Sequence, residues 1–449
     1  MTELDFPPLP SGVDRLRAAP STAQLRPLPD GATTVWAYED LAPGPELRVV
    51  AGERVQVRLE NGLPQDTAVH WHGISIDNAM DGVPGLTQDT VPAGEVFDYD
   101  FVAPYAGTYW YHTHDRSWEQ NARGLHGPLI VEETESFDVD REVTLLIEDW
   151  RLDDDGGFDE DSLGSPVEWS HGGRTGNLLT VNGRTFPTVD VVAGERVRFR
   201  VINTANARIL GVAFGAHPAT VVALDGYPLD VPRPVDEYVL LSPAQRADIV
   251  VDMTGEPGSS GEVSLVTQDG PLAGAGLVYG PDAPIRSSFA EVPALPDAGR
   301  LGAIDLSDPV RLELLMEGGA MGRMREAMLD GEMMDAGALS DEGRYWSLNG
   351  VAGDLDKPLG SVAMGRTVVV SIRNETSFPH AMHLHGHHFR VLSRNGAEDP
   401  TQDLRDTELL GAGETVEIAF VADNPGKWLL HCHMLEHAVA GMITWLEVV

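Results

Sequence analysis

The sequence predicts an all-β protein built from three related β-domains. Short runs rich in Val, Ile, Phe and Tyr recur along the 449 residues and are broken by Gly, Pro, Asn and Asp, which is typical of strands and turns. Apolar residues at helical spacing are scarce over long stretches. The length suggests about three domains of about 150 residues each, and internal repeats give the same number.

Three segments carry the first repeat. Residues 52–61, 194–203 and 365–374 each begin with Gly, continue as a strand pattern and end with Asn. A segment that recurs in this way indicates copies of one structural unit. We therefore expect an equivalent strand in each of three domains.

A second repeat joins only the first and third copies. Residues 93–114 align without a gap with residues 412–433, and HWHG at 70–73 matches HLHG at 383–386. The middle copy has a single histidine, His217, in its strand region. We interpret the middle domain as a spacer without metal ligands.

Turn-rich joints mark the expected domain boundaries. One joint lies near residues 133–140, and the second lies in the Pro-rich stretch 281–310. The predicted domains are residues 1–136, residues 137–290 and residues 291–449.

Composition excludes several classes of partner. Acidic residues outnumber basic ones by 70 to 31, for a formal net charge of −39, which argues against nucleic acid and anionic membrane surfaces. No stretch is apolar and long enough to cross a bilayer, so no membrane partner is expected. Residues 1–30 lack the pattern of a signal peptide. Either an export signal has been removed or the protein stays in the cytoplasm.

Histidines occur in pairs spaced two residues apart. On a strand this spacing puts both imidazoles on one face. A single pair is weak evidence for a metal, but four pairs in equivalent places of repeated domains indicate a metal cluster. Eight imidazoles would line a cleft between the first and third domains and suit a polynuclear copper site: His70, His72, His112, His114, His383, His385, His431 and His433.

The only cysteine, Cys432, lies between two of these histidines. With no second cysteine an internal disulfide is excluded. A strand turns Cys432 to the face opposite its neighbours. A thiolate, two imidazoles and a weak thioether form the ligand set of a blue electron-transfer copper. The other ligands would be His380, His437 and Met442, the last two from the loop after the strand.

These motifs resemble those of the multicopper oxidases, the family of laccases, bilirubin oxidases and bacterial cuprous oxidases. They are HWHG (70–73), HTH (112–114), HAMHLHG (380–386) and HCHMLEHAVAGM (431–442). The likeness runs over nearly the full length. It implies three cupredoxin-like Greek-key domains of β-sandwich or barrel form.

The resemblance also implies four copper ions per chain and a place for each. It implies four successive one-electron oxidations of a substrate and reduction of O2 to two waters. The type 1 copper would be held by His380, Cys432, His437 and Met442, the type 2 copper by His70 and His383, and the type 3 pair by His72, His112, His114, His385, His431 and His433.

Two further positions bear on proton supply. In relatives an acidic residue beyond HWHG delivers protons, and Asp81 takes its place here; the alternative is a turn residue before Gly82. Bacterial relatives often have an acidic residue directly after the last type 1 histidine, but this sequence has Ala438. Glu436 lies two residues before that position.

Six of the thirteen methionines lie close together in the third domain. Three of them, Met321, Met324 and Met328, have the spacing of one stripe on a short helix. Such a stripe can fill a core, but thioethers are also soft ligands that prefer Cu(I). Cuprous oxidases of the family similarly carry a Met-rich insertion early in the third domain. The predicted copper-handling set is Met316, Met321, Met324, Met328, Met333 and Met334.

The sequence leads to one functional hypothesis and two alternatives. We expect an oxidase that converts Cu(I) with O2, in the service of copper tolerance. An axial Met implies a low-to-middling potential, which disfavours phenols that are hard to oxidise. The alternatives are a laccase-like oxidase of phenols or aromatic amines and a non-catalytic copper store. The resemblance and the toxicity of copper imply a periplasmic or secreted monomer.

Overall fold

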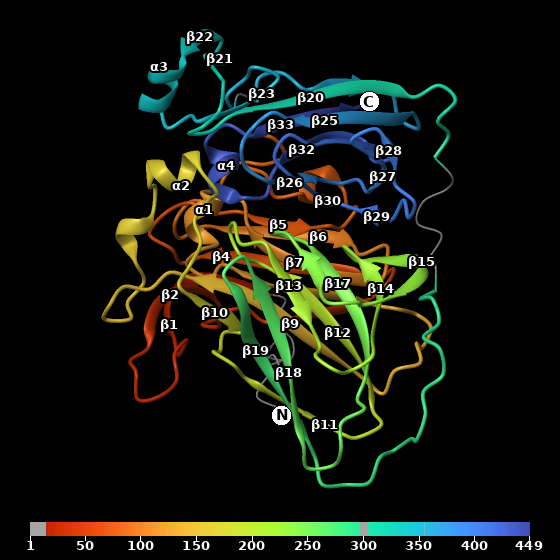
Figure 1. Cartoon of the computed structure of the whole chain (residues 1–449). Helices are drawn as coiled ribbons and strands as arrows, with labels where there is room; N and C mark the ends of the chain where they lie inside the picture. Colours follow the sequence, from red (N-terminus) through yellow and green to blue (C-terminus); the bar gives the residue numbers. More distant parts are fainter. Residues whose placement is uncertain (1–14, 297–303, 354) are drawn as a thin grey trace.

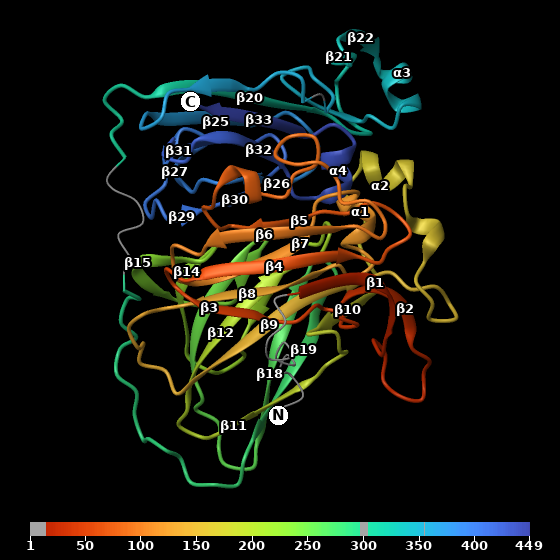
Figure 2. The ribbon, with the colours of Figure 1, turned by 180° about the vertical axis from the view of Figure 1, so that it is seen from behind.

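The structure is a computed structural model that describes residues 15–296, 304–353 and 355–449. Its chain is mostly β and forms three domains, each with two main packed sheets. Figures 1 and 2 show the third domain, cyan to blue, above the first domain, which is red to orange, with the green second domain beneath. The predicted fold class is confirmed. The boundary residues stay a prediction, and part of the second joint, residues 297–303, lies outside the described residues.

The strands of the first domain are β1 (Arg15–Ala23), β2 (Thr33–Tyr38), β3 (Leu47–Val50), β4 (Arg54–Asn61), β5 (Val69–His72), β6 (Val96–Val102), β7 (Gly107–Thr113) and β8 (His126–Glu132). They form two sheets with the orders β2-β1-β4-β6 and β3-β8-β7-β5. In β4 the alternation that the sequence shows is realised, because Val55, Val57 and Leu59 are buried and the residues between them are more exposed. β7 is buried along its whole length.

The strands of the second domain are β9 (Arg141–Trp150), β10 (Leu178–Val181), β11 (Thr188–Val191), β12 (Arg196–Asn203), β13 (Leu210–Ala213), β14 (Ala219–Leu224), β15 (Tyr227–Pro234), β16 (Val239–Leu241), β17 (Arg246–Asp252), β18 (Ser260–Thr267) and β19 (Gly270–Tyr279). Their sheets have the orders β10-β9-β12-β17-β14-β15 and β11-β19-β18-β13-β16. A hydrophobic core lies between the two sheets.

The strands of the third domain are β20 (Val310–Gly318), β21 (Glu326–Leu329), β22 (Glu332–Asp335), β23 (Trp346–Leu348), β24 (Gly360–Val362), β25 (Thr367–Asn374), β26 (His380–Leu384), β27 (Phe389–Arg394), β28 (Ala397–Glu398), β29 (Leu404–Arg405), β30 (Thr407–Leu410), β31 (Thr415–Val421), β32 (Gly426–Cys432) and β33 (Ile443–Val448). The large sheet has the order β23-β20-β25-β31-β27-β28, with β29 beside β27, and the second has the order β24-β33-β32-β26-β30. β21 and β22 form a hairpin outside both.

Helices are short throughout the described residues. They are η1 (Asn78–Met80), α1 (Ser117–Gln120), η2 (Glu160–Ser162), α2 (Pro166–Ser170), α3 (Ala336–Asp341) and α4 (Leu435–Val439). α1, α2 and α4 come from the three different domains, and α4 contacts the other two. In the part of the chain that is described, no helix has the length and apolarity to cross a membrane.

The first repeat corresponds to one strand position in all three domains. β4, β12 and β25 each run parallel to the first strand of their own domain, β1, β9 and β20. Each also pairs antiparallel on its other side, with β6, β17 and β31. The three copies are therefore equivalent in structure as well as in sequence.

The Asn that ends each repeat has a shared local function. The side-chain oxygens of Asn61, Asn203 and Asn374 each accept from the backbone N–H two residues later, at 2.9, 3.1 and 2.9 Å. Their amide nitrogens donate to backbone carbonyls of the loop that follows and of a neighbouring segment. A buried amide with all these partners fixes the loop after each strand.

The predicted helical stripe of methionines is wrong. Met321 lies in a turn, Met324 lies in an irregular segment, and Met328 lies on β21 of the hairpin. The deciding signal is Asp330-Gly331, which adopts positive φ at both positions and connects the two strands as a tight turn. Ala327 and Leu329 alternate inward from β21 and pack with Leu339 of α3.

Candidate metal centre

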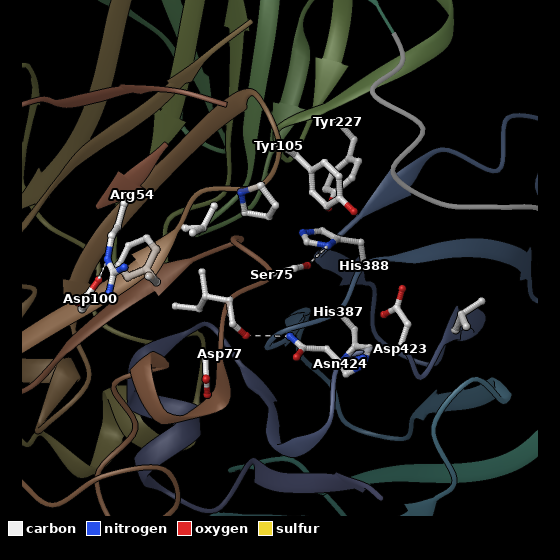
Figure 3. A pocket seen from close by; sticks show the side chains of 15 residues that line it. Arg54, Ser75, Asp77, Asp100, Tyr105, Tyr227, His387, His388, Asp423 and Asn424 are labelled. Carbon is white, nitrogen blue, oxygen red and sulfur yellow. Dashed lines mark hydrogen bonds and ion pairs between the residues drawn. The ribbon is translucent and has the colours of Figure 1, made fainter. Parts of the chain in front are cut away.

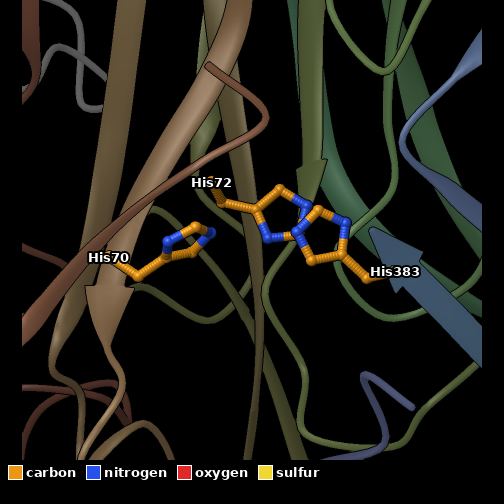
Figure 4. A group of neighbouring side chains, drawn as sticks. All are labelled: His70, His72 and His383. Atoms are coloured by element: carbon orange, nitrogen blue, oxygen red, sulfur yellow. The ribbon is translucent and has the colours of Figure 1, made fainter. Parts of the chain in front are cut away.

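Two pairs of strands bring eight histidines to the interface of the first and third domains. β5 pairs with β7 so that His70 faces His112, and β26 pairs with β32 so that His383 faces His431. Across the interface the ring of His72 stacks on that of His383, with centroids 3.8 Å apart. Figure 4 shows His70, His72 and His383 converging from the two sides.

Three groups of nitrogen atoms in this cluster could each hold a metal ion. The first group is His72, His112 and His433, and the second is His114, His385 and His431. The third group joins His70 and His383 to His72. Each group takes ligands from both the first and the third domain, so neither domain contains a complete site.

Backbone carbonyls fix the orientation of several rings. The Nδ1 atoms of His70, His112 and His431 donate to the carbonyls of Asp81, Thr113 and Cys432 at 2.7, 2.8 and 2.9 Å. A carbonyl only accepts, so the proton sits on Nδ1 and leaves Nε2 with a free lone pair. The local fold therefore selects the tautomer that a metal needs.

The remaining nitrogens have the properties of metal ligands. Nε2 of His70, His112 and His383, Nδ1 of His72 and both nitrogens of His433 are buried and meet no hydrogen-bond partner among the described residues. Unpaired buried polar atoms are costly. Burial and neighbouring imidazoles also lower the pKa values of His72, His112, His383 and His433, that of His112 to well below its usual range. Neutral imidazoles in this number fit copper.

A second site lies on the other face of β32. Cys432 Sγ is 3.6 Å from Nδ1 of His380 and 3.8 Å from Nδ1 of His437, and these two nitrogens are 3.0 Å apart. The outer nitrogens are held by Thr376 Oγ1 at 2.8 Å and by the carbonyl of His171 at 2.7 Å. His437 lies on α4 and not in a loop.

The chemistry of this second group fits a soft metal ion. Burial raises the pKa of the Cys432 thiol to about 12, so a cation is needed to make it a thiolate at neutral pH. Burial lowers the pKa of His437 to about 4. Met442 is buried in the same core cluster, and its backbone oxygen accepts from the N–H of Cys432 at 3.0 Å. One thiolate with two imidazoles and a thioether suits copper.

The acidic residues near the sites fall in different places. Asp81 is buried; its Oδ2 lies 2.9 Å from Nδ1 of His385, and its Oδ1 lies 3.3 Å from Nδ1 of His70. Ala438 lies on α4 and carries no polar side chain. Glu436 is buried beside it and accepts from Asn206 Nδ2 at 2.8 Å, and burial raises its pKa.

Sequence patterns did not reveal Asp406. This fully buried residue has Oδ1 at 3.2 Å from Nε2 of His72 and 3.5 Å from Nδ1 of His383. Burial acts to raise the pKa of Asp406, but Arg246 and His72 hold it well below its usual range. One Asp without a repeated partner gives no spacing signal. Its neighbour in the structure, Arg246, comes from a different domain.

A cavity of about 550 Å³ is lined by residues of all three domains. Its wall includes Tyr105 and Tyr227, and His388 whose Nε2 donates to the carbonyl of Gly73 at 2.7 Å. Figure 3 shows His388 and Ser75 together on the wall, with Asp423 further along it. One residue of the cavity wall is therefore hydrogen-bonded to the backbone next to His72.

The methionines are distributed unevenly between core and surface. Met316 is fully buried in the core of the third domain. Met321 and Met333 are 65% and 58% exposed, and Met324, Met328 and Met334 are half-buried. Met316 therefore lies apart from the five exposed or half-buried methionines.

Comparison with known proteins identifies the family. Multicopper oxidase family models match residues 21–136, 141–260 and 328–449. The chain is 30% identical to the multicopper oxidase MmcO of Mycobacterium tuberculosis, over 92% of this chain and 82% of that protein. It is similar to the crystal structure of a Pseudomonas thermotolerans multicopper oxidase (33% identity, TM-score 0.84, 97% of this chain and 98% of the other). It is also similar to that of Lac15 from a marine microbial metagenome (39% identity, TM-score 0.77, 97% and 99%). The chain belongs to the multicopper oxidase family.

Proposed function

We propose that this multicopper oxidase oxidises Cu(I) to Cu(II) and reduces O2 to water. Four Cu(I) ions, four protons and one O2 give four Cu(II) ions and two waters. Resident copper, when bound, supplies the one-electron steps and the reduction of O2. The proposed ligands are His380, Cys432, His437 and Met442 for type 1 copper, His70 and His383 for type 2, and His72, His112, His114, His385, His431 and His433 for the type 3 pair.

The observation that carries the Cu(I) proposal is the place of Met321. The N–H of Ala320 donates to the carbonyl of Ser170 at 2.8 Å, which ties the turn that contains Met321 to the residue before His171. The carbonyl of His171 accepts in turn from Nε2 of His437 at 2.7 Å. An exposed thioether is thus attached, through two backbone contacts, to a proposed type 1 ligand.

The hairpin adds a pair of thioethers on the same side of the molecule. Met328 and Met333 are direct cross-strand partners in β21 and β22, so their side chains share one face at close range. Figures 1 and 2 both show the hairpin beyond α2, the helix that leads to His171. Thioethers favour Cu(I) over harder ions.

The type 1 ligands themselves are covered. His380 and His437 are fully buried, and α2 with His171 lies over the outer nitrogen of His437. A bulky phenol has no direct contact with either imidazole in this arrangement. A Cu(I) ion bound at the thioethers needs no such contact. The hydrogen bond from Nε2 of His437 to the carbonyl of His171 connects the proposed type 1 ligand to the segment that lies next to the methionine turn.

The cluster side of the proposal concerns O2 and protons. The cavity beside His388 is the proposed approach for O2. Asp81, which contacts His70 and His385, is the proposed holder of a proton at its carboxylate oxygens. We propose a monomeric protein that is located in the periplasm or outside the cell, because free Cu(I) is toxic inside the cell. Cell fractionation tests this location.

The experiment replaces three thioethers by a side chain of similar volume. The triple variant Met321→Leu, Met328→Leu and Met333→Leu should raise KM for Cu(I) about tenfold or more and leave oxidation of a small phenol unchanged. Met364→Leu is the matched control, because Met364 is 62% exposed and does not belong to the hairpin or to the turn that contains Met321. Unchanged Cu(I) kinetics in the triple variant would remove Cu(I) as the substrate. A copper-loaded wild type that consumes no O2 with any reductant would leave only the copper store.

A further inference from the structure

The middle domain supplies no histidine to the cluster, yet one of its side chains reaches the ligands. Arg246, the first residue of β17, is fully buried. Its Nη1 and Nη2 donate to Oδ1 and Oδ2 of Asp406 at 2.9 and 2.6 Å. Such a two-point contact fixes the plane of the carboxylate as well as its position.

Asp406 transmits this fixed position to ligands of the first and the third domain. Its Oδ1 accepts from Nε2 of His72, and its backbone carbonyl accepts from Nδ1 of His383 at 2.9 Å. The two rings lie nearly parallel, with an interplanar angle of 17°. Asp406 therefore stands behind the stacked pair at which the first and third domains meet.

This contact explains an asymmetry among the ligands. His70, His112 and His383 leave Nε2 without a partner, but His72 leaves Nδ1, because Asp406 occupies its Nε2. Without the carboxylate, nothing among the described contacts would choose between the two nitrogens of His72. The ring would then be free to present the wrong one.

Further hydrogen bonds from Arg246 reach the first and second domains, so that with Asp406 it contacts all three. Nε donates to the carbonyl of Thr108 at 3.1 Å in the first domain, and Nη2 to that of Asp225 at 2.9 Å in the second. Asp225 also contacts Asp406 directly, because its Oδ2 accepts from the backbone N–H of Asp406 at 3.3 Å. Arg246, Asp225 and Asp406 therefore form a ring of hydrogen bonds. Gly73 makes room for the pair, since a Cβ there would meet Arg246 Nη2 at 2.3 Å.

We propose that Arg246 is a positioning residue for the oxygen-reducing cluster: through Asp406 it selects the ligating nitrogen of His72 and sets how the two half-sites face each other. The middle domain is then more than a spacer. This inference rests on copper binding by the histidines and is independent of which substrate is oxidised.

The test uses the copper-loaded full chain and Arg246→Lys, which keeps the charge and loses the two-point contact. The expected result is that the variant keeps the blue absorption of the Cys432 site. Copper of the cluster should be removed by a chelator at about 10- to 100-fold lower concentration, and the type 2 electron paramagnetic resonance spectrum should change.

The matched control is Arg196→Lys. Arg196 makes the same kind of buried two-point contact with Asp252 at the other end of β17, at 2.6 and 3.0 Å. The Arg196→Lys variant should keep the chelator resistance of the cluster copper that the wild type has. Asp406→Asn, which keeps the side-chain volume, tests the same link if the lysine variant does not fold, and should show the same selective loss.

Two results would overturn the proposal. One is a folded Arg246→Lys or Asp406→Asn protein with wild-type chelator resistance and type 2 spectrum. The other is equal loss of cluster copper in the Arg196→Lys control, which would trace the effect to general stability. A wild type that binds no cluster copper would instead refute the ligand assignment itself.

Discussion

Thr113 and Cys432 occupy the same place in two copies of one strand. Both lie between histidines that face the cluster, on β7 and on β32. Thr113 Oγ1 donates to Oε1 of Gln120 on α1 at 2.6 Å, whereas Cys432 Sγ faces His380 and His437 on β26 and α4. The backbone is thus compatible with either role. Side chains on the opposing strand and the following helix decide whether the position is structural or binds metal.

The largest effect is expected when the third domain is made like the first. Cys432→Thr removes the thiolate, so the blue absorption and turnover should be lost and copper per chain should fall by one. The cluster histidines stay in place, so the type 2 spectrum should persist. Absorption and metal analysis check this, and a persistent blue band would show that Cys432 is not the ligand.

The glycines after the two histidine pairs, Gly73 and Gly386, are also equivalent. A Cβ at Gly73 would meet Arg246 at 2.3 Å, and one at Gly386 would meet Trp428 at 2.2 Å. Gly73→Ala and Gly386→Ala should each lower the free energy of unfolding by about 2–5 kcal/mol, from overpacking and positive φ together.

Gly52→Ala is the control for these glycines. Gly52 has the same φ of 89° as Gly73 but meets nothing within 4 Å, so only about 1 kcal/mol is expected. Urea unfolding of all three variants gives the comparison. Equal losses would mean that backbone conformation, and not the contact, accounts for the effect.

A buried histidine in one copy corresponds to an apolar residue in the other. His387 follows the third-domain pair as Ile74 follows that of the first, and both are buried. Burial lowers the pKa of His387 to about 4, below an unfolded value of about 6.5. Between these values the unfolded chain binds more protons, so stability falls as the pH falls.

His387→Ile should remove that dependence. Relative to the wild type, the apoprotein variant should gain about 2 kcal/mol in free energy of unfolding at pH 5 compared with pH 8. Urea titrations at the two pH values measure the difference. A difference independent of pH would show that His387 does not titrate between them.

The smallest effect is expected at Thr113. Thr113→Val removes the hydrogen bond to Gln120, but Gln120 Oε1 keeps a second donor, Thr67 Oγ1 at 2.7 Å. A loss of about 1 kcal/mol in the free energy of unfolding is expected, with an unchanged blue absorption. A change in that absorption would mean that the two strand positions are coupled.

Repetition explains what the sequence could predict. The three domains and the paired histidines recur with fixed spacing, and the alternation of a strand places them on one face. Asp406 and Arg246 occur once, in different domains, and their meeting depends on how complete domains pack. In the methionine segment the helical spacing is misleading, because the Asp330-Gly331 turn forms a hairpin instead. His171 contacts His437 through its backbone carbonyl. A pattern of side chains cannot predict such a contact.

The shared cluster has a consequence for biosynthesis. His72 and its partner Asp406 are 334 residues apart in the chain, so the ribosome completes β5 and β7 long before β26 and β32 exist. A nascent first domain presents four histidines of a site that has no other half. The three groups of ligand nitrogens are complete only after the last domain has folded against the first, so an ion that needs all ligands of one group could bind only when translation and assembly are finished.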